Sequence, residues 1–325
     1  MRAHRRALFA VLGALVVIAA GLVFWSSSNG RPEALHLQVV TKSTSTSSTT
    51  TSTTPPQPPF PVADETLTFT DPSRPTPARG DVPGHPGRTL VTVIRRPVGP
   101  KGPLPLVVFA HGWDSSPAVY ETLLDTWAAA GYLVAAPTFP DSASTLPGEP
   151  VSNYPEQALD MSFIITNLLG GAAGSVDPNK IAVAGHSDGG TDVALLALNP
   201  DYADHRIRAY LSLSGEIPAG VSGTWSAATP GSLFVAVGTD DEYGLYPNAV
   251  QVFQSANMPK AFVSLTGGDH LQTFIGDTPQ AADMRTETVR FLNAAMSTPH
   301  ITSAQIAAAL APPPDPAINI NPVPG

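Results

Sequence analysis

A serine between closely spaced glycines is the clearest chemical feature of the chain. Residues 185–189 have the sequence Gly-His-Ser-Asp-Gly, with Ser187 at the centre. An apolar run at 181–184 precedes this segment, and residues 188–198 continue with apolar side chains at helical spacing. A serine on a sharp turn from a buried strand into a helix needs small neighbours, because larger side chains would collide there. The context predicts that Ser187 is a nucleophile. The alternative is a glycine-rich turn without catalytic function.

The sequence also offers a base and an acid for this serine. Serine is a weak nucleophile until a base takes its proton, and a third group must orient that base. When the serine lies on a strand-to-helix turn of this kind, the acid and then the histidine follow it in the chain. His270, shortly after the last apolar run, satisfies this order. Asp241 is the preferred acid because it lies three residues after Gly238, at the end of the preceding run, and Asp240 and Glu216 are the alternatives.

Acyl transfer also requires backbone N–H donors for the oxyanion. The residue after the nucleophile, Asp188, is predicted to supply one donor. The second donor is expected from the loop after an earlier strand-like run. In that loop Trp113 is the preferred donor and Asp114 is the next candidate. We interpret His111 and His186, which precede the serine, as residues that brace loops.

Apolar runs of strand length recur along the middle of the chain, and helical patterns separate most of them. One such pattern is an apolar stripe between residues 120 and 127. The alternation predicts an α/β fold, with a mostly parallel sheet covered by helices on both faces. Ligands of such sheets bind at the carboxyl ends of the strands, where the candidate residues above are located. The runs are 90–94, 106–110, 133–136, 181–184, 209–213, 233–237 and 261–265.

The same pattern argues against a cap over the site. The segment 214–232, between two of the predicted strands, is short and contains several glycines and prolines. These residues leave no room for a helical cap domain. The loop after 133–136 is also short and contains proline. We therefore expect an open cleft, edged by Trp113 and, as a weaker candidate, Trp225.

The composition excludes several classes of function. The chain has 325 residues, a net charge of −9 and no cysteine. An acidic chain without a basic stripe is a poor match for nucleic acid or an anionic membrane surface. The absence of cysteine removes disulfides and thiolate metal sites. The sequence contains no metal-binding motif, phosphate loop or dinucleotide motif. We expect no metal, no cofactor and no nucleic-acid partner.

The N-terminus resembles a targeting segment. Arg2, Arg5 and Arg6 precede an uncharged run at 7–25. At about 1.5 Å per residue this run approaches the thickness of a bilayer core. Basic residues on the short side favour a cytoplasmic N-terminus. Residues 1–25 are thus predicted to be a signal anchor, with a cleaved signal peptide as the alternative. The rest of the chain is expected outside the cytoplasm, held at the membrane by this segment only, or secreted after cleavage.

The remaining chain divides into three parts. Residues 26–59 are rich in Ser, Thr and Pro and are predicted to be a flexible stalk. Residues 60–296 contain all the predicted strands and form the catalytic domain. Residues 297–325 are rich in Pro and Ala and are predicted to be a disordered tail, with one short helix near 303–310.

These motifs together resemble the α/β-hydrolase superfamily. The resemblance covers residues 60–296 and rests on Leu-Val-Val-Phe-Ala-His-Gly-Trp at 106–113, Gly-His-Ser-Asp-Gly-Gly at 185–190, and the late Gly-Thr-Asp-Asp and Gly-Gly-Asp-His. Within the superfamily, Asp-Pro-Ser-Arg at 71–74 followed by Gly-Arg-Thr-Leu at 87–90 is similar to the dienelactone-hydrolase-like, chlorophyllase and platelet-activating-factor acetylhydrolase group. Dienelactone hydrolases proper have cysteine at the position of Ser187.

The resemblance implies an α/β-hydrolase fold without a cap domain and an activity on carboxylic esters without a cofactor. A small-molecule or lipid-like ester is the expected substrate. Asp188 departs from the apolar residue that many relatives carry after the nucleophile, which makes the floor of the pocket more polar. Two other functions remain open at this point, a serine peptidase of the same fold and a non-catalytic anchored protein of the cell envelope.

Overall fold

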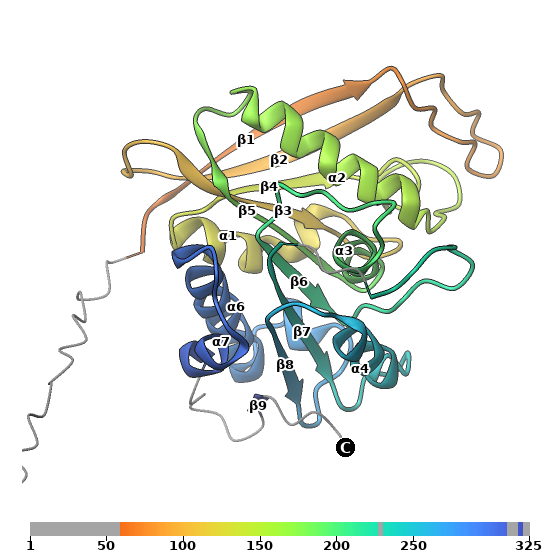
Figure 1. Cartoon of the computed structure of the whole chain (residues 1–325). Helices are drawn as coiled ribbons and strands as arrows, with labels where there is room; N and C mark the ends of the chain where they lie inside the picture. The colour runs from red at the N-terminus through yellow and green to blue at the C-terminus, as the bar shows by residue number, and fades with distance from the viewer. Residues whose placement is uncertain (1–58, 227–229, 311–317, 321–325) are drawn as a thin grey trace, which may run out of the picture. The chain divides into compact units, whose positions relative to one another are not determined.

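One twisted sheet runs through the described part of the chain (Figure 1). The computed structural model describes residues 59–226, 230–310 and 318–320. Within these residues nine strands follow one another in the order β1-β2-β4-β3-β5-β6-β7-β8-β9. The six central strands β4, β3, β5, β6, β7 and β8 run parallel to one another, whereas β1, β2 and β9 pair antiparallel at the two edges of the sheet. Their bounds are β1 Val62–Asp71, β2 Arg88–Pro97, β3 Leu104–Ala110, β4 Leu133–Thr138, β5 Val176–His186, β6 Ala209–Leu213, β7 Ser232–Gly238, β8 Lys260–Leu265 and β9 Ile318–Ile320.

Helices cover both faces of this sheet (Figure 1). The side chains of α2, α3 and α4 contribute to one apolar core, and those of α1, α6 and α7 contribute to the other. The prediction of a mostly parallel sheet with helices on both faces is therefore confirmed. The helix bounds are η1 Pro117–Tyr120, α1 Glu121–Ala129, α2 Tyr154–Leu169, α3 Asp188–Leu198, α4 Tyr246–Ser255, α5 Gln272–Ile275, α6 Pro279–Ser297 and α7 Ser303–Leu310.

The central strand β3 shows why its sequence is a continuous apolar run. Leu106 and Val108 point into the core beneath α2 and α3, while Val107 and Phe109 point into the core beneath α1 and α6. All four side chains are fully buried. Because alternate residues of a strand face opposite sides, a strand with helices on both sides must be apolar at every position. Each of the seven predicted strands is present in the sheet.

The chain beyond residue 296 differs from the prediction of a disordered tail. The helix α7, expected from its sequence, is packed onto the sheet by the fully buried Ile306 and Leu310. The strand β9 then pairs with the edge of β8. The sequence analysis also did not identify β1, which pairs with β2 over the whole of its length. The predicted anchor, most of the predicted stalk, and residues 311–317 and 321–325 lie outside the described residues.

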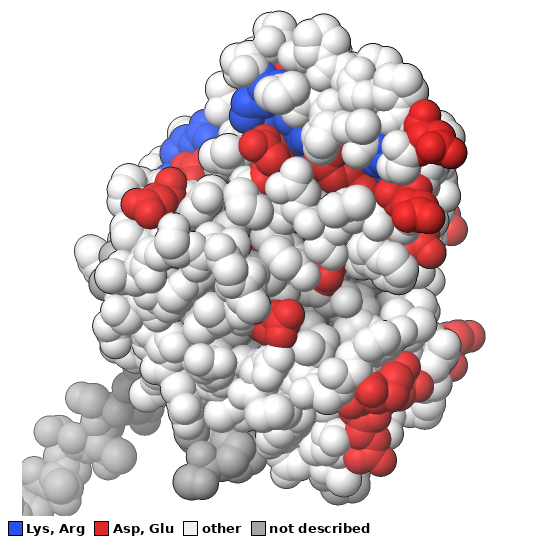
Figure 2. Space-filling model, turned by 90° about the vertical axis from the view of Figure 1, so that its right-hand side faces the viewer, with Lys and Arg blue, Asp and Glu red and all other residues white. Residues whose placement is uncertain are grey.

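The described part of the chain contains no helix that is both long enough and apolar enough to cross a bilayer. Its charges are unevenly distributed over the face in Figure 2, where Asp and Glu side chains lie at several separate places and Lys and Arg side chains gather in the upper half.

The described residues of the two segments considered for a cap contain no helix. Residues 139–153, between β4 and α2, form an irregular loop. Between β6 and β7, the described residues 214–226 and 230–231 also lack a helix or strand. The carboxyl ends of the parallel strands are therefore not covered by a helical domain within the residues that the structure describes.

Candidate active site

Ser187 lies on the sharp turn between β5 and α3. Its backbone has φ +58° and ψ −120°, a left-handed conformation that is unusual for a residue with a side chain. Such a conformation costs about 1–3 kcal/mol and persists only where the surroundings enforce it. Here the Ser187 N–H donates to the carbonyl of Leu213 at the end of β6, at 2.9 Å. The side chain of Ser187 is partly accessible and lines a surface cleft.

The glycines around Ser187 allow this turn to form. A Cβ atom on Gly185 would lie 2.1 Å from the carbonyl oxygen of Gly189. A Cβ atom on Gly189 would lie 2.1 Å from the carbonyl oxygen of Ala110, at the end of β3. Distances this short are not tolerated between real atoms, so the start of α3 can approach β3 and β5 only because both residues lack a side chain.

His270 and Asp241 form a buried pair beside the serine. The Nδ1–H of His270 donates to Oδ2 of Asp241 at 2.8 Å, and the Asp241 side chain is fully buried. The Tyr243 N–H donates to the other carboxylate oxygen at 3.1 Å. Burial alone would raise the pKa of Asp241, but the hydrogen bond and charge of His270 outweigh it and lower the pKa below its usual value. A carboxylate in this position fixes the tautomer of His270, so that Nε2 is the nitrogen that can accept a proton.

The other two candidate acids do not reach the histidine. Asp240 is exposed and accepts a hydrogen bond from the hydroxyl of its neighbour Thr239 at 3.1 Å. Glu216 accepts a hydrogen bond from the side chain of Asn248. Of the three acids considered from the sequence, the structure places only Asp241 against His270.

Two neighbouring loops deliver this pair. The loop after β7 carries Asp241, and the loop after β8 carries His270. The Asp240 N–H donates to the carbonyl of Gly268 at 3.0 Å, and the His270 N–H donates to Oε2 of Glu242 at 3.0 Å. The backbones come so close that a Cβ atom on Gly238 would lie 2.0 Å from the Gly268 carbonyl oxygen. The acid and the base are therefore fixed relative to each other by backbone contacts as well as by their own hydrogen bond.

The loop after β3 contains the candidate oxyanion donor. The Gly112 N–H donates to the hydroxyl of Tyr120 at 3.2 Å, and the Asp114 N–H donates to the carbonyl of Ser142 at 2.9 Å. Because both neighbouring amides are engaged, Trp113 remains the candidate donor of this loop. Asp188 begins α3, where backbone N–H groups have no partner within the helix. The two predicted donors thus come from loops on adjacent strands and line the same cleft as Ser187.

Two comparisons relate this chain to known proteins. The family described as Chlorophyllase matches residues 82–224, a segment that includes Ser187 and Trp113 but ends before Asp241. A solved ferulic acid esterase from Streptomyces cinnamoneus superimposes with a TM-score of 0.55, covering 78% of this chain and 97% of that chain at 20% sequence identity. The chain has the α/β-hydrolase fold. A search of curated proteins found no match to this chain.

A buried histidine joins the two halves of the candidate site. The Nε2–H of His186 donates to the carbonyl of His270 at 2.8 Å, and the Tyr120 hydroxyl donates to Nδ1 of His186 at 2.9 Å. Burial lowers the pKa of His186 to about 3 and raises the pKa of Tyr120 to about 12, so both groups remain uncharged near neutral pH. Since Tyr120 also holds the Gly112 N–H, the contacts run continuously from the oxyanion loop to the base.

His111 braces the same loop from the other side. Its Nδ1–H donates to the carbonyl of Gly112 at 2.8 Å, and its Nε2 accepts the N–H of Phe139 at 3.1 Å. The side chain is fully buried, and burial lowers its pKa to about 4. A neutral imidazole with both nitrogens engaged is suited to holding the loop.

The cleft above Ser187 has a volume of about 600 Å³ and a partly apolar rim. Trp113 is 52% exposed and Tyr243 is 70% exposed, and both line the cleft. The Trp113 indole N–H donates to the carbonyl of Pro150 at 3.1 Å, and the Tyr243 ring meets the His270 ring edge-on at 4.6 Å. The expectation for Trp225 is wrong, because this side chain packs on the core beneath α2 to α4 and does not line the cleft.

Asp188 forms part of the cleft wall and is held by two residues that the sequence analysis did not identify as part of the site. Its carboxylate accepts hydrogen bonds from the hydroxyl of Ser152 and from the hydroxyl of Tyr154, the latter at 3.1 Å. Ser152 lies near the end of the irregular loop from β4, and Tyr154 is the first residue of α2. That loop has no periodic pattern, so its position over the site could not be predicted from the sequence.

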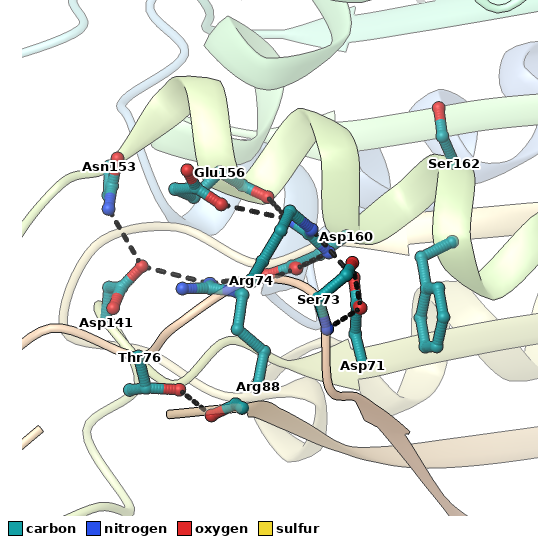
Figure 3. Close-up of polar contacts among 12 residues, drawn as sticks. Asp71, Ser73, Arg74, Thr76, Arg88, Asp141, Asn153, Glu156, Asp160 and Ser162 are labelled. Atoms are coloured by element: carbon teal, nitrogen blue, oxygen red, sulfur yellow. Dashed lines mark hydrogen bonds and ion pairs between the residues drawn. The ribbon is translucent and has the colours of Figure 1, made fainter. Parts of the chain in front are cut away.

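A buried set of ion pairs holds the start of α2 and its preceding loop in place (Figure 3). The fully buried Arg88 donates to both oxygens of Asp160 in α2, at 2.9 and 2.6 Å, and to Asp141 at 3.0 Å. Arg74 donates to Asp160 at 2.7 Å from the turn after β1. The side chain of Asn153, next to Ser152, donates to Asp141 at 3.1 Å. These contacts connect β2 with the wall of the cleft.

Within the described residues, no group of three or more histidine or acidic side chains is arranged to hold a metal ion. The side chains and backbone N–H groups around Ser187 are arranged in a way that suits nucleophilic attack, proton transfer and stabilisation of an oxyanion.

Proposed function

We propose that this protein is a serine hydrolase that cleaves carboxylic esters through an acyl-enzyme on Ser187. The observation that carries the proposal is the hydrogen bond of His270 to buried Asp241 in the cleft that contains Ser187 on its strained turn. The names of the matched family and structure, Chlorophyllase and ferulic acid esterase, support esters as the substrate class.

The proposed reaction follows from the positions of these groups. The Ser187 hydroxyl attacks the ester carbonyl while Nε2 of His270 takes its proton. Asp241 stabilises the imidazolium, and the amides of Asp188 and Trp113 stabilise the oxyanion. The alcohol leaves with the proton from His270. Water then attacks the acyl-enzyme with His270 as the base, which releases the acid and restores Ser187.

The uncovered cleft supports esters that are dissolved in water. A site without a lid has nothing for a lipid surface to displace, and product release does not depend on lid opening. We propose acids of short to medium chain length as the acyl group, because the cleft has a volume of about 600 Å³ and is open to solvent.

An activity-based label separates this function from its alternatives. The full chain is treated with a fluorophosphonate probe and assayed on p-nitrophenyl esters of graded chain length. We expect labelling and turnover in the wild type, and loss of both in Ser187→Ala with the melting temperature preserved. Ser222→Ala, in an exposed loop, is the matched control and should behave as the wild type. Absence of labelling would favour a non-catalytic protein, and labelling with cleavage of peptides but not esters would favour a peptidase.

We also propose that the catalytic domain lies outside the cytoplasm. The three arginines before the uncharged run at 7–25 support this location. Cell fractionation and the intact mass of the mature chain test it. An intact N-terminus in the membrane fraction supports the anchor, loss of the first ~28 residues supports a cleaved signal peptide, and an intact chain in the cytoplasmic fraction contradicts both.

A further inference from the structure

The cleft around Ser187 has an uneven charge distribution. Two acidic residues, Asp188 and Asp114, line it, and no lysine or arginine is among its described lining residues. Burial raises the pKa of Asp188, and the charge of a third carboxylate, Glu216, adds to this, while the hydrogen bonds from Ser152 and Tyr154 oppose it. An entering substrate therefore meets a surface with negative charge close to the nucleophile.

Asp188 is held in a fixed position in this wall. The hydroxyls of Ser152 and Tyr154 both donate to its carboxylate. The residue also begins α3, where the helix dipole favours a negative charge. Because Asp188 follows Ser187 directly in the chain, its Cα atom is about 3.8 Å from that of the nucleophile. A charge on the substrate next to the scissile bond would lie near this carboxylate.

The aromatic rim is a second feature that attracts positive charge. Trp113 and Tyr243 present large exposed surfaces to the cleft. The faces of aromatic rings attract cations, most strongly ammonium and guanidinium groups that are partly desolvated. A carboxylate in the wall of the cleft and aromatic rings at its rim both favour a positively charged group, and neither favours an anion.

Building on the proposed esterase function, we infer that Asp188 determines charge specificity, so that the site prefers esters with a cationic group near the scissile bond and disfavours anionic ones. A unit positive charge about 6 Å from the carboxylate would raise kcat/KM by roughly 3-fold if the medium between them behaves as bulk water, and by roughly 100-fold if it behaves as a protein surface. The cleft is open, so we expect a value near tenfold.

Three esters of butyric acid test this inference. Their alcohols are choline, 3,3-dimethylbutanol and 3-hydroxypropionate, which carry a positive charge, no charge and a negative charge. Release of butyric acid by the full chain is followed in a pH-stat at pH 7 and low salt. In the wild type we expect kcat/KM to fall about tenfold from the choline ester to the neutral ester, and further for the anionic ester.

The role of Asp188 is read from the ratio of kcat/KM for the cationic ester to kcat/KM for the neutral ester. Asp188→Asn keeps the backbone N–H and nearly the same shape, and should reduce this ratio to within about twofold of unity. Asp240→Asn removes an equally charged group from an exposed position that does not line the cleft, and should leave the ratio at its wild-type value. The comparison separates a local effect of Asp188 from a change in net charge.

Two outcomes distinguish the inference from the function on which it rests. If the neutral ester is hydrolysed but the wild type shows no preference for choline, or Asp188→Asn keeps that preference, charge selection by Asp188 is overturned while the esterase stands. If none of the three esters is hydrolysed and Ser187 is not labelled by the fluorophosphonate, the proposed function fails and the inference fails with it.

Discussion

Arg88 provides a direct test of how buried ion pairs support the cleft. Arg88→Met keeps a long side chain and removes the charge that serves Asp160 and Asp141. Removing one partner of a buried ion pair costs about 3–5 kcal/mol of unfolding free energy, because the other charge stays buried without compensation. Arg74 still pairs with Asp160 at 2.7 Å. We therefore expect the lower part of this range, about 3–4 kcal/mol.

Thermal unfolding measures this loss. For a domain of this size, 1 kcal/mol shifts the melting temperature by roughly 2–4 °C, so Arg88→Met should melt about 6–16 °C below the wild type. The matched control is Arg74→Met, whose side chain is partly exposed and whose loss leaves Arg88 paired with both carboxylates. It should melt closer to the wild type. A loss for Arg88→Met no larger than that for Arg74→Met would refute the reasoning.

Three further predictions concern the acid, a buried carboxyl and the cleft. Asp241→Asn should lower kcat by several orders of magnitude, on the order of 10⁴, because only Asp241 fixes the His270 tautomer. Asp240→Asn should lower kcat by less than threefold. Steady-state kinetics on a p-nitrophenyl ester measure both variants, and the reverse ranking would show that the acid is Asp240. Asp192 is fully buried, with no hydrogen-bond partner for either carboxylate oxygen among the described residues, and burial together with the charges of Asp188 and Asp160 raises its pKa well above 3.8. As pH rises, the unfolded chain releases this proton before the folded chain does, so the wild type loses unfolding free energy that Asp192→Asn keeps. The difference in unfolding free energy between the variant and the wild type should therefore grow by up to about 1.4 kcal/mol per pH unit above pH 4. Denaturant unfolding from pH 4 to 7 measures it, and a difference that does not change with pH contradicts this prediction. Hydrolysis of tributyrin should follow a smooth saturation curve, and a sharp rise in rate at its solubility limit would show that a lid exists.

The sequence predicted best those parts of the fold that are buried on both sides. The buried segments of β3 and of β5 to β8 are mostly apolar because helices cover both their faces. By contrast, β1 lies at the edge, with acidic and threonine side chains at most of its exposed positions. This strand is stabilised by pairing with β2, which follows about 20 residues later, and the composition of β1 alone does not reveal this pairing.

The site was predictable where local backbone geometry dictates the residue type. Ser187 stood out because its turn requires flanking glycines, and His270 because of its place in the chain order. The distinction between Asp241 and Asp240 is different, since two adjacent carboxylates are chemically equivalent until one of them faces the histidine. The bridge from Tyr120 through His186 could not be inferred, because it joins side chains 66 residues apart. Tyr120 was recognised only as part of an apolar helix stripe.

The bridge from Tyr120 through His186 to His270 has a practical consequence for directed evolution of this protein. A substitution in this chain of buried contacts would disturb the oxyanion donors and the general base together. Saturation libraries that include these positions would therefore contain mostly inactive clones. The rim residues Trp113 and Tyr243 project into solvent beside the same site. Because the Tyr243 ring meets the ring of His270, Trp113 is the better position to randomise. Varying the Trp113 side chain while keeping the bridge and Tyr243 constant would change substrate selectivity without changing the proton-transfer geometry.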